Sequence, residues 1–265
     1  MNQAFDRPAS AYDREFTFSR IGTAQRHAVW RYLATLLHTP SMQVLELNCG
    51  TGTDAVHFAQ HGHEVLATDI SAEMIQVATE KVKQYGAEDR VQLKRMSFEE
   101  LGDRPFGGRF DLVFSNFGGL NCIDRTDLAR LLADVDRCLC PGGRFIAVVM
   151  PDRCVAETVY FFLKGQLKEA FRRGRHEPIW AGLSGSGVMT WYHSPRTFSE
   201  LAAPLFKRVA VRPIGFFVPP SYLEPRFHDK PKLLSRLARW DDRIPNWGFL
   251  ARYSDHFLID LEKRG

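Results

Sequence analysis

A short apolar run, Val44 to Leu47, passes directly into the turn Asn48-Cys-Gly-Thr-Gly52. From Asp54 onward the apolar residues recur at helical spacing, so this stretch predicts a strand, a glycine turn and a helix. Gly50 and Gly52 allow the backbone to approach a ligand closely, and the unpaired N–H groups of the helix start point toward it. The stretch therefore predicts an α/β sheet with a nucleotide-type binding site at the turn.

A second strand is predicted for residues 63–70, and Asp69 stands near its end. An acidic residue about 20 positions beyond a glycine turn is placed to accept hydrogen bonds from ribose hydroxyls. Ser71 has the character of an N-cap for a helix over residues 72–84, with Met74 in its first turn. We therefore expect Asp69 to bind a ribose.

Taken together, the two motifs carry a family resemblance. Glu46, Gly50 and Gly52, followed by residues 67–71, resemble the first two motifs of the class I S-adenosylmethionine-dependent methyltransferases. Asn48 stands where that family has its first glycine, and Asn tolerates a positive φ better than other non-glycine residues. The resemblance implies S-adenosylmethionine as cofactor, with S-adenosylhomocysteine as product. The phosphate-loop pattern G-x-x-x-x-G-K-[S/T] is absent, so an ATPase has no support.

The resemblance also implies a set of cofactor contacts. Tyr12 lies in a Tyr-Asp segment of the kind that folds over the cofactor, although it could instead anchor a surface helix. Ser97 and Phe98 follow the third strand, where the family commonly has Asp-Ala, and the Ser97 hydroxyl with the Phe98 N–H could bind adenine. Asn116 and Phe117 lie in the exit loop of the fourth strand. The full set is Tyr12, Glu46, Asn48, Gly50, Gly52, Asp69, Ile70, Met74, Ser97, Phe98, Asn116 and Phe117.

The same resemblance gives the expected architecture, a Rossmann-like α/β fold with a seven-stranded, mostly parallel sheet in the order 3-2-1-4-5-7-6. Residues 1–265 form one domain, in which residues 1–40 are an N-terminal helical lid. Residues 151–194 are an inserted lid on the substrate side, with an amphipathic helix over residues 155–171 and a Ser/Gly-rich hinge. A Pro-Gly-Gly turn at residues 141–143 is expected to lead from a helix into the fifth strand.

Methyl transfer chiefly requires the acceptor and the methyl carbon to be held in line. A general base is needed only if the acceptor is protonated, as a phenol or hydroxyl is. His193, beside Tyr192 at the end of a strand expected over residues 188–193, is the preferred base, and a packing role is its alternative.

Bulk properties indicate a protein of the cytoplasm. There is no apolar run of 18 residues and no signal-peptide pattern, so we expect no membrane partner. Five cysteines without zinc-like spacing indicate reduced thiols and no metal site. Residues 151–265 hold 19 Lys and Arg against 12 Asp and Glu, but no block of like charge, which makes nucleic acid an unlikely partner and leaves an anionic substrate open.

We therefore expect a methyltransferase that acts on an O or N atom of a small molecule in a biosynthetic pathway. An RNA-modifying methyltransferase, a protein that binds the cofactor without catalysis, and a nicotinamide-linked oxidoreductase are the alternatives, the last disfavoured by the glycine spacing. Neither the acceptor nor the oligomeric state follows from the sequence.

Overall fold

The computed structural model describes residues 12–38, 41–104, 106–175, 177–183, 186–227 and 229–265. The expected N-terminal lid of residues 1–40 is therefore described only in part, and residues 184 and 185 of the expected hinge lie outside the described residues. The strands are β1 Gln43–Leu47, β2 Glu64–Asp69, β3 Val91–Arg95, β4 Phe110–Ser115, β5 Leu139–Val149, β6 Ile179–Leu183, β7 Ser186–Thr190, β8 Phe206–Ile214 and β9 His256–Lys263. The α-helices are α2 Arg20–Leu33, α3 Thr53–Gln60, α4 Ala72–Gln84, α5 Arg125–Cys138, α6 Val155–Leu163, α7 Leu167–Ala170, α8 Pro195–Ala202, α9 Glu224–Phe227 and α10 Pro231–Asp241. A π-helix, η1 Asp13–Thr17, precedes α2, and the 3-10 helices are η2 Glu99–Asp103, η3 Gly119–Cys122, η4 Arg172–Gly174, η5 Ser221–Leu223 and η6 Gly248–Tyr253.

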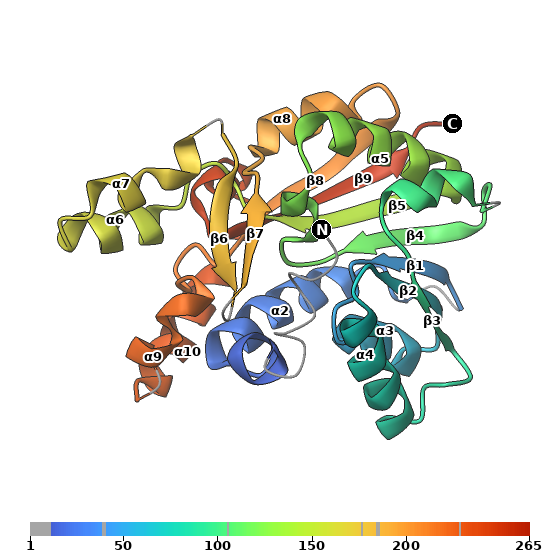
Figure 1. Ribbon diagram of the computed structural model, residues 1–265, viewed down its shortest axis with the longest axis horizontal. Coiled ribbons are helices and arrows are strands. Elements are labelled where there is room, and N and C mark those ends of the chain that lie inside the picture. The colour runs from blue at the N-terminus through green and yellow to red at the C-terminus, as the bar shows by residue number, and fades with distance from the viewer. Residues whose placement is uncertain (1–11, 39–40, 105, 176, 184–185, 228) are drawn as a thin grey trace.

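Seven strands form one twisted sheet in the order β3-β2-β1-β4-β5-β9-β8 (Figure 1). The first five run parallel, and β9 lies antiparallel between β5 and β8. With β8 and β9 as the sixth and seventh strands, this is the predicted order, so the predicted Rossmann-like fold is confirmed. Parallel strands connected through helices place their carboxyl ends at one edge, where open α/β sheets bind ligands.

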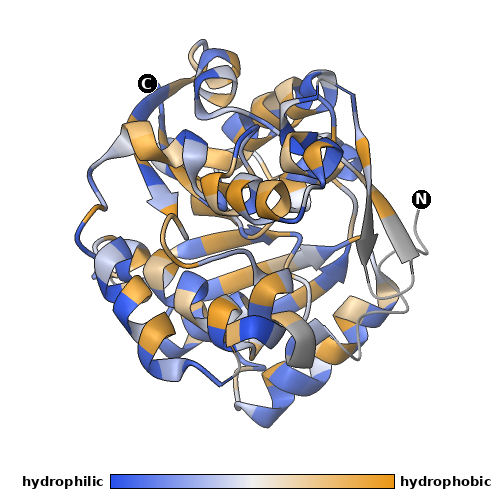
Figure 2. Cartoon of the chain, turned by 90° about the vertical axis from the view of Figure 1, so that its left-hand side faces the viewer, coloured by the Kyte–Doolittle hydropathy of each residue, from blue (hydrophilic) through white to orange (hydrophobic). Residues whose placement is uncertain are grey.

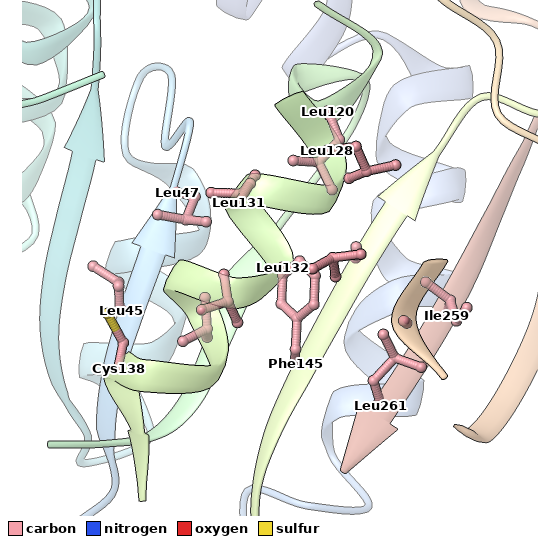
Figure 3. Close-up of a cluster of buried hydrophobic side chains, with 14 of the residues drawn as sticks. Leu45, Leu47, Leu120, Leu128, Leu131, Leu132, Cys138, Phe145, Ile259 and Leu261 are labelled. Carbon is pink, nitrogen blue, oxygen red and sulfur yellow. The ribbon is translucent and has the colours of Figure 1, made fainter. Parts of the chain in front are cut away.

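Alternating residues of the strands fill two separate cores. On one face, Leu45 and Leu47 pack with Phe145 and with the apolar side of α5, as Figure 3 shows. On the other face, Val44 and its neighbours pack with α2, α3 and α4. Helices thus cover both sides of the sheet (Figure 1) and leave its carboxyl edge as the place for a site.

Two local predictions are corrected. The Pro-Gly-Gly segment does not end a helix, because α5 stops at Cys138 and residues 141–143 lie within β5, where the pairing with β4 shifts register. The expected long helix over residues 155–171 is two helices, α6 and α7, since Gly165 adopts a positive φ of 71° between them. The chain then forms the β6–β7 hairpin, which pairs Leu183 with Ser186.

Among the described residues, no helix is both long enough and apolar enough to cross a membrane.

Candidate active site

The glycine turn after β1 has the backbone geometry that the sequence predicts. Asn48, Gly50 and Gly52 all have positive φ angles, of 47°, 54° and 75°. A Cβ atom on Gly52 would lie 2.9 Å from the Cβ of Ala78 on α4, so no larger residue fits there. The expectation that Asn48 replaces a family glycine by adopting a positive φ is confirmed.

The Asn48 side chain ties the ends of two parallel strands together. Its Oδ1 accepts a hydrogen bond from Ser115 Oγ at 2.5 Å, and its Nδ2 donates to the carbonyl of Asn116 at 2.8 Å. A Cβ atom on Gly119 would overlap the Asn48 amide. Asn48 and Gly119 therefore fit together as a pair, and the amide fixes the exit of β4 against the glycine turn.

Asp69 is buried at the end of β2 and joins this turn through the backbone. Its Oδ2 accepts from the N–H of Gly50 at 2.9 Å, and its Oδ1 accepts from the N–H of Ser71 at 2.9 Å. The two oxygens of this carboxylate thus hold the glycine turn and the start of α4 in place. The geometry fits the predicted contact with ribose hydroxyls.

Three buried carboxylates surround the start of α3, namely Glu46, Asp54 and Asp69. Arg26 of α2 forms an ion pair with Asp54, and Asn116 Nδ2 donates to the same carboxylate at 2.9 Å. Burial opposes the ionisation of Asp54, but Arg26 and the donors outweigh it and lower its pKa.

Glu46 is in the opposite situation, because burial, together with the charges of Asp54 and Asp69, raises its pKa well above the usual range. Glu46 Oε2 has no hydrogen-bond partner among the described residues. A cation placed beside this carboxylate would stabilise its ionised form. The cluster thus fits a ligand that carries positive charge, as S-adenosylmethionine does in its sulfonium and ammonium groups.

The segment before α2 is fastened over the glycine turn. Lys81 Nζ of α4 pairs with Asp13 at 2.7 Å and also donates to Thr51 and Thr53 at 3.0 and 2.8 Å. The Tyr12 ring lies 4.0 Å from the position of a Cβ on Gly50, and burial raises the pKa of Tyr12 to about 12. A neutral aromatic ring therefore covers the turn.

Phe117, directly after β4, has a positive φ of 43°, which is unusual for a residue without a capping role. Its ring contacts three groups from distant parts of the chain. The centre of the ring lies 5.1 Å from Cζ of Arg26, 5.4 Å from the ring centre of Phe16 and 5.2 Å from that of His256. Strained backbone of this kind persists where surrounding contacts hold it, often at ligand sites. Phe117 thus lies between Arg26 and His256, which belongs to a second polar cluster.

That second cluster is built on Asp255 and His256, at the start of β9. His256 Nδ1 lies 3.2 Å from Asp255 Oδ2, and the Asp255 carboxylate also accepts from Arg173 at 2.7 Å and from Gln25 at 3.1 Å. Burial opposes its ionisation, but His256 and Arg173 beside it lower the pKa of Asp255 below its usual value. An imidazole beside a carboxylate is an arrangement that general acid–base catalysis uses.

The sequence profile described as "Methyltransferase domain" matches residues 44–143, which contain the glycine turn, Asp69 and the loop of Asn116 and Phe117. Residues 44–143 form a methyltransferase domain.

Known methyltransferases resemble this chain over a longer stretch. The demethylmenaquinone methyltransferase of Lactiplantibacillus plantarum is 35% identical over 164 residues, which are 59% of this chain and 65% of that protein. The malonyl-acyl-carrier-protein O-methyltransferase of Pectobacterium atrosepticum is 32% identical over 155 residues, or 58% and 54%. The chain thus spans between about half and two thirds of the length of these relatives.

The fold has counterparts among solved structures. The S-adenosylmethionine-dependent methyltransferase of Mesorhizobium loti superposes with a TM-score of 0.56 at 19% identity, covering 88% of this chain and 96% of that one. This likeness is one of fold, and together with the profile match over residues 44–143 it agrees with the family predicted from the sequence.

The remaining predicted contacts of the methyltransferase domain lie beside Asp69. The N–H of Met96 donates to the Asp69 carbonyl at 2.9 Å, so the loop of Ser97 and Phe98 starts next to it. The Ser97 N–H donates to Glu100 at 2.8 Å, and the Phe98 side chain packs partly against the core.

Ile70 and Met74 continue from Asp69 on the other side. The Ile70 carbonyl accepts from Arg95 at 3.0 Å, and the Met74 N–H donates to the Ser71 cap at 3.1 Å. All of the predicted cofactor contacts are thus at the carboxyl edge or over it, where their contacts to the cofactor remain predictions.

His193 does not have the surroundings of a general base. Its ring is 1% exposed, its Nε2 lies 3.1 Å from the carbonyl of Ile123, and burial lowers its pKa. These surroundings fit the packing role named as the alternative, and the base role of His193 stays a prediction.

Two residues of this site, Arg26 and His256, were not predicted from the sequence. Arg26 has a signal that could have been read, because it shares a helical face with Val29 and Leu33, where an arginine is out of place unless paired. The sequence carries no such signal for His256, because only the sheet topology brings it to Phe117.

Proposed function

We propose that the protein is an enzyme that transfers the methyl group of S-adenosylmethionine to a small molecule. The observation that carries this proposal is the buried Glu46 carboxylate beside the glycine turn, whose Oε2 has no hydrogen-bond partner among the described residues, in a cluster that fits a positively charged ligand. When bound, the cofactor supplies an already activated methyl group, so the protein must chiefly hold the acceptor in line.

The cofactor half of the cleft would be held as follows. Asp69 accepts hydrogen bonds from the ribose hydroxyls, while Ser97 and Phe98 face the adenine with Ile70 and Met74 nearby. Glu46 and Arg26, of opposite charge, suit the ammonium and carboxylate of the methionine part. The glycine turn of Asn48, Gly50 and Gly52 lines the cofactor, with Tyr12 above it. Asn116 and Phe117 lie toward the methyl group.

For the acceptor, we propose a carbon or oxygen atom that becomes nucleophilic only when a proton is lost, such as a phenol or the ring carbon of a hydroxylated ring. The pair of His256 and Asp255 on the far side of Phe117 supports this, because a free amine would need no base. By its name, one of the relatives above acts on demethylmenaquinone, which fits a ring-carbon acceptor of this kind.

The first test is calorimetric binding of S-adenosylhomocysteine to the protein and to Asp69→Ala, with NADH as the control ligand. We expect micromolar binding that weakens in the variant, and a thermal shift that follows it by mass action. Binding of NADH instead, or no response of the wild type to either ligand, would remove the cofactor assignment.

The acceptor is then sought with a cofactor labelled in its methyl group. Phenols, hydroxylated rings, amines and carboxylates are offered in turn, and the labelled position in the product is found by NMR. Transfer to an amine with no transfer to the hydroxylated compounds would contradict the acceptor class proposed here.

A further inference from the structure

Helix α6 presents its apolar side to the surroundings. Val155, Val159, Phe162 and Leu163 are all exposed, Leu163 to 79%, and their spacing of four, three and one places them on one face. Glu157, on the opposite face, is only 2% exposed. This is the reverse of an ordinary surface helix, which buries its apolar stripe.

The inverted orientation is fixed by strong contacts on the inner face. Glu157 pairs with Arg172 at 2.8 Å and with Arg173 at 3.0 Å, and it accepts from Tyr222 at 3.2 Å. Burial opposes its ionisation, but Arg173 and Arg172 outweigh it and lower the pKa of Glu157. Breaking this network to turn the helix over would leave a charge unpaired, so the apolar face is held outward.

Two more exposed apolar side chains extend the face beyond Gly165. Leu167 of α7 and Phe171 after it are both more than half exposed. We call these six residues the α6–α7 surface: Val155, Val159, Phe162, Leu163, Leu167 and Phe171. The two helices project from the left of Figure 1, and Figure 2, viewed from that side, shows hydrophobic residues on the helices that face the viewer.

Cations border this surface. Lys164, Lys168 and Arg175 are exposed along the same segment. Lys164 and Arg226 of α9 both lie over the Tyr160 ring, at 4.6 and 5.0 Å from its centre. Exposed apolar side chains beside lysine, arginine and a boundary tyrosine are the pattern of a helix that lies in an interface between water and anionic lipid.

From these observations we infer that the α6–α7 surface docks on an anionic membrane surface. A second copy of the chain fits less well, because a two-fold contact through this face would bring the same lysines against each other. Six side chains are also few beside the roughly 20 to 30 per partner of a stable protein interface. The earlier expectation of no membrane partner rested on the lack of a spanning segment, which does not bear on docking at a surface.

Docking in this orientation would put the membrane next to the acceptor half of the cleft. The inner face of α6 connects through Glu157 and Arg173 to Asp255, which adjoins His256. The docking itself does not depend on the proposed methyl transfer and is tested without it.

The test is vesicle flotation of the full chain, without cofactor. Vesicles of phosphatidylcholine alone are compared with vesicles containing about a third phosphatidylglycerol. We expect binding to the anionic vesicles that weakens with added salt, and little binding to the neutral ones.

Three variants separate the contributions. Phe162→Ser with Leu163→Ser should reduce vesicle binding at least about tenfold, because the inserted apolar area is lost. Lys164→Glu combined with Lys168→Glu should reduce vesicle binding by more than about fivefold for each substitution. The double variant should also lose most of the salt dependence of vesicle binding. Tyr85→Ser, a half-exposed aromatic of the α4 end on the other side of the molecule, is the matched control and should bind as the wild type does.

Equal binding of the wild type and the Phe162→Ser, Leu163→Ser variant, or no binding of the wild type, would overturn the inference. Light scattering without lipid tests the other occupant. A wild-type dimer that this double variant converts to a monomer would make the surface a contact between copies instead. Thermal unfolding of each variant checks that it is folded.

Discussion

The N–H of Gly50 donates to Asp69 Oδ2 at 2.9 Å, so the carboxylate proposed to bind the ribose also shapes the glycine turn. Asp69→Asn can offer one oxygen, whereas the N–H groups of Gly50 and Ser71 need two. We expect the variant to lose about 1–3 kcal/mol of unfolding free energy even without ligand. Urea unfolding measures this, with the exposed Asp103→Asn as control. A loss seen only with ligand present would mean that Asp69 serves binding alone.

Asn48 and Gly119 should be coupled. Gly119→Ala places a methyl group on the Asn48 amide, and we expect a loss of about 1–3 kcal/mol from overpacking. Adding Asn48→Gly removes the amide while keeping the positive φ, so the double variant should regain part of the loss. A double-mutant cycle on the unfolding free energies gives the coupling, and simple additivity would show that the two residues do not compete for space.

Lys81 should hold the segment with Tyr12 over the cofactor. Lys81→Met leaves the Asp13 carboxylate without its cationic partner and with only the hydroxyl of Thr51, so the segment is expected to undock and place Asp13 in water. Trypsin should then cut at Arg20 faster, and the Kd for S-adenosylhomocysteine should rise by about tenfold. The exposed Lys83→Met serves as control. An unchanged cleavage rate with intact binding would show that Lys81 does not fasten the segment.

His57 should make the fold sensitive to mild acid. Burial lowers its pKa from 6.5 to about 4, with His61 nearby adding to the shift. As the pH falls below about 6.5, His57 becomes protonated in the unfolded chain but stays neutral in the folded protein. The free energy of unfolding therefore falls between pH 6.5 and about pH 4. His57→Phe keeps the stack on Trp30, whose ring centre is 4.0 Å away, and does not titrate. Its unfolding free energy, followed over this window, should fall less steeply than that of the wild type; parallel curves would exclude His57.

Substitution of His256 should affect catalysis, whereas substitution of His193 should affect stability. His256→Asn is expected to lower kcat by about 10² to 10⁴, with S-adenosylhomocysteine binding unchanged. His193→Asn should lower the unfolding free energy by about 1–3 kcal/mol and leave kcat of the remaining folded enzyme unchanged. If His193→Asn lowers kcat to this extent and His256→Asn does not, the prediction that His193 is the base was correct.

The cofactor half of the cleft follows from local sequence, because its parts are close together in the chain. The turn from Glu46 to Gly52 and the acid at Asp69 belong to one strand–helix–strand unit, whose geometry is set by short-range backbone chemistry. Even the substitution at Asn48 was predictable, since the requirement for a positive φ belongs to one residue.

The acceptor half could not be predicted from local sequence. His256 and Phe117 are far apart in the sequence, and only the position of β9 in the sheet brings them together. His193 was chosen for its neighbours in sequence, but whether a ring faces a cleft or the core depends on tertiary packing. Glu157 likewise gave no sign that it would be buried, because its partners Arg172 and Arg173 lie beyond a break in the helix.

The reversed direction of β9 has a consequence for the order in which the molecule is completed. Because β9 runs against its neighbours, its first residue, His256, stands at the same edge as the last residues of β1, β2 and β4. The segments that shape the cofactor half lie within the first 120 residues and are synthesised early. The acceptor half needs His256 and is complete only after that residue has been synthesised. Because Leu258 and Ile259 of β9 also fill the cores on the two faces of the sheet, the last strand completes the core and the acceptor half together, and methyl transfer would begin only when it closes the sheet.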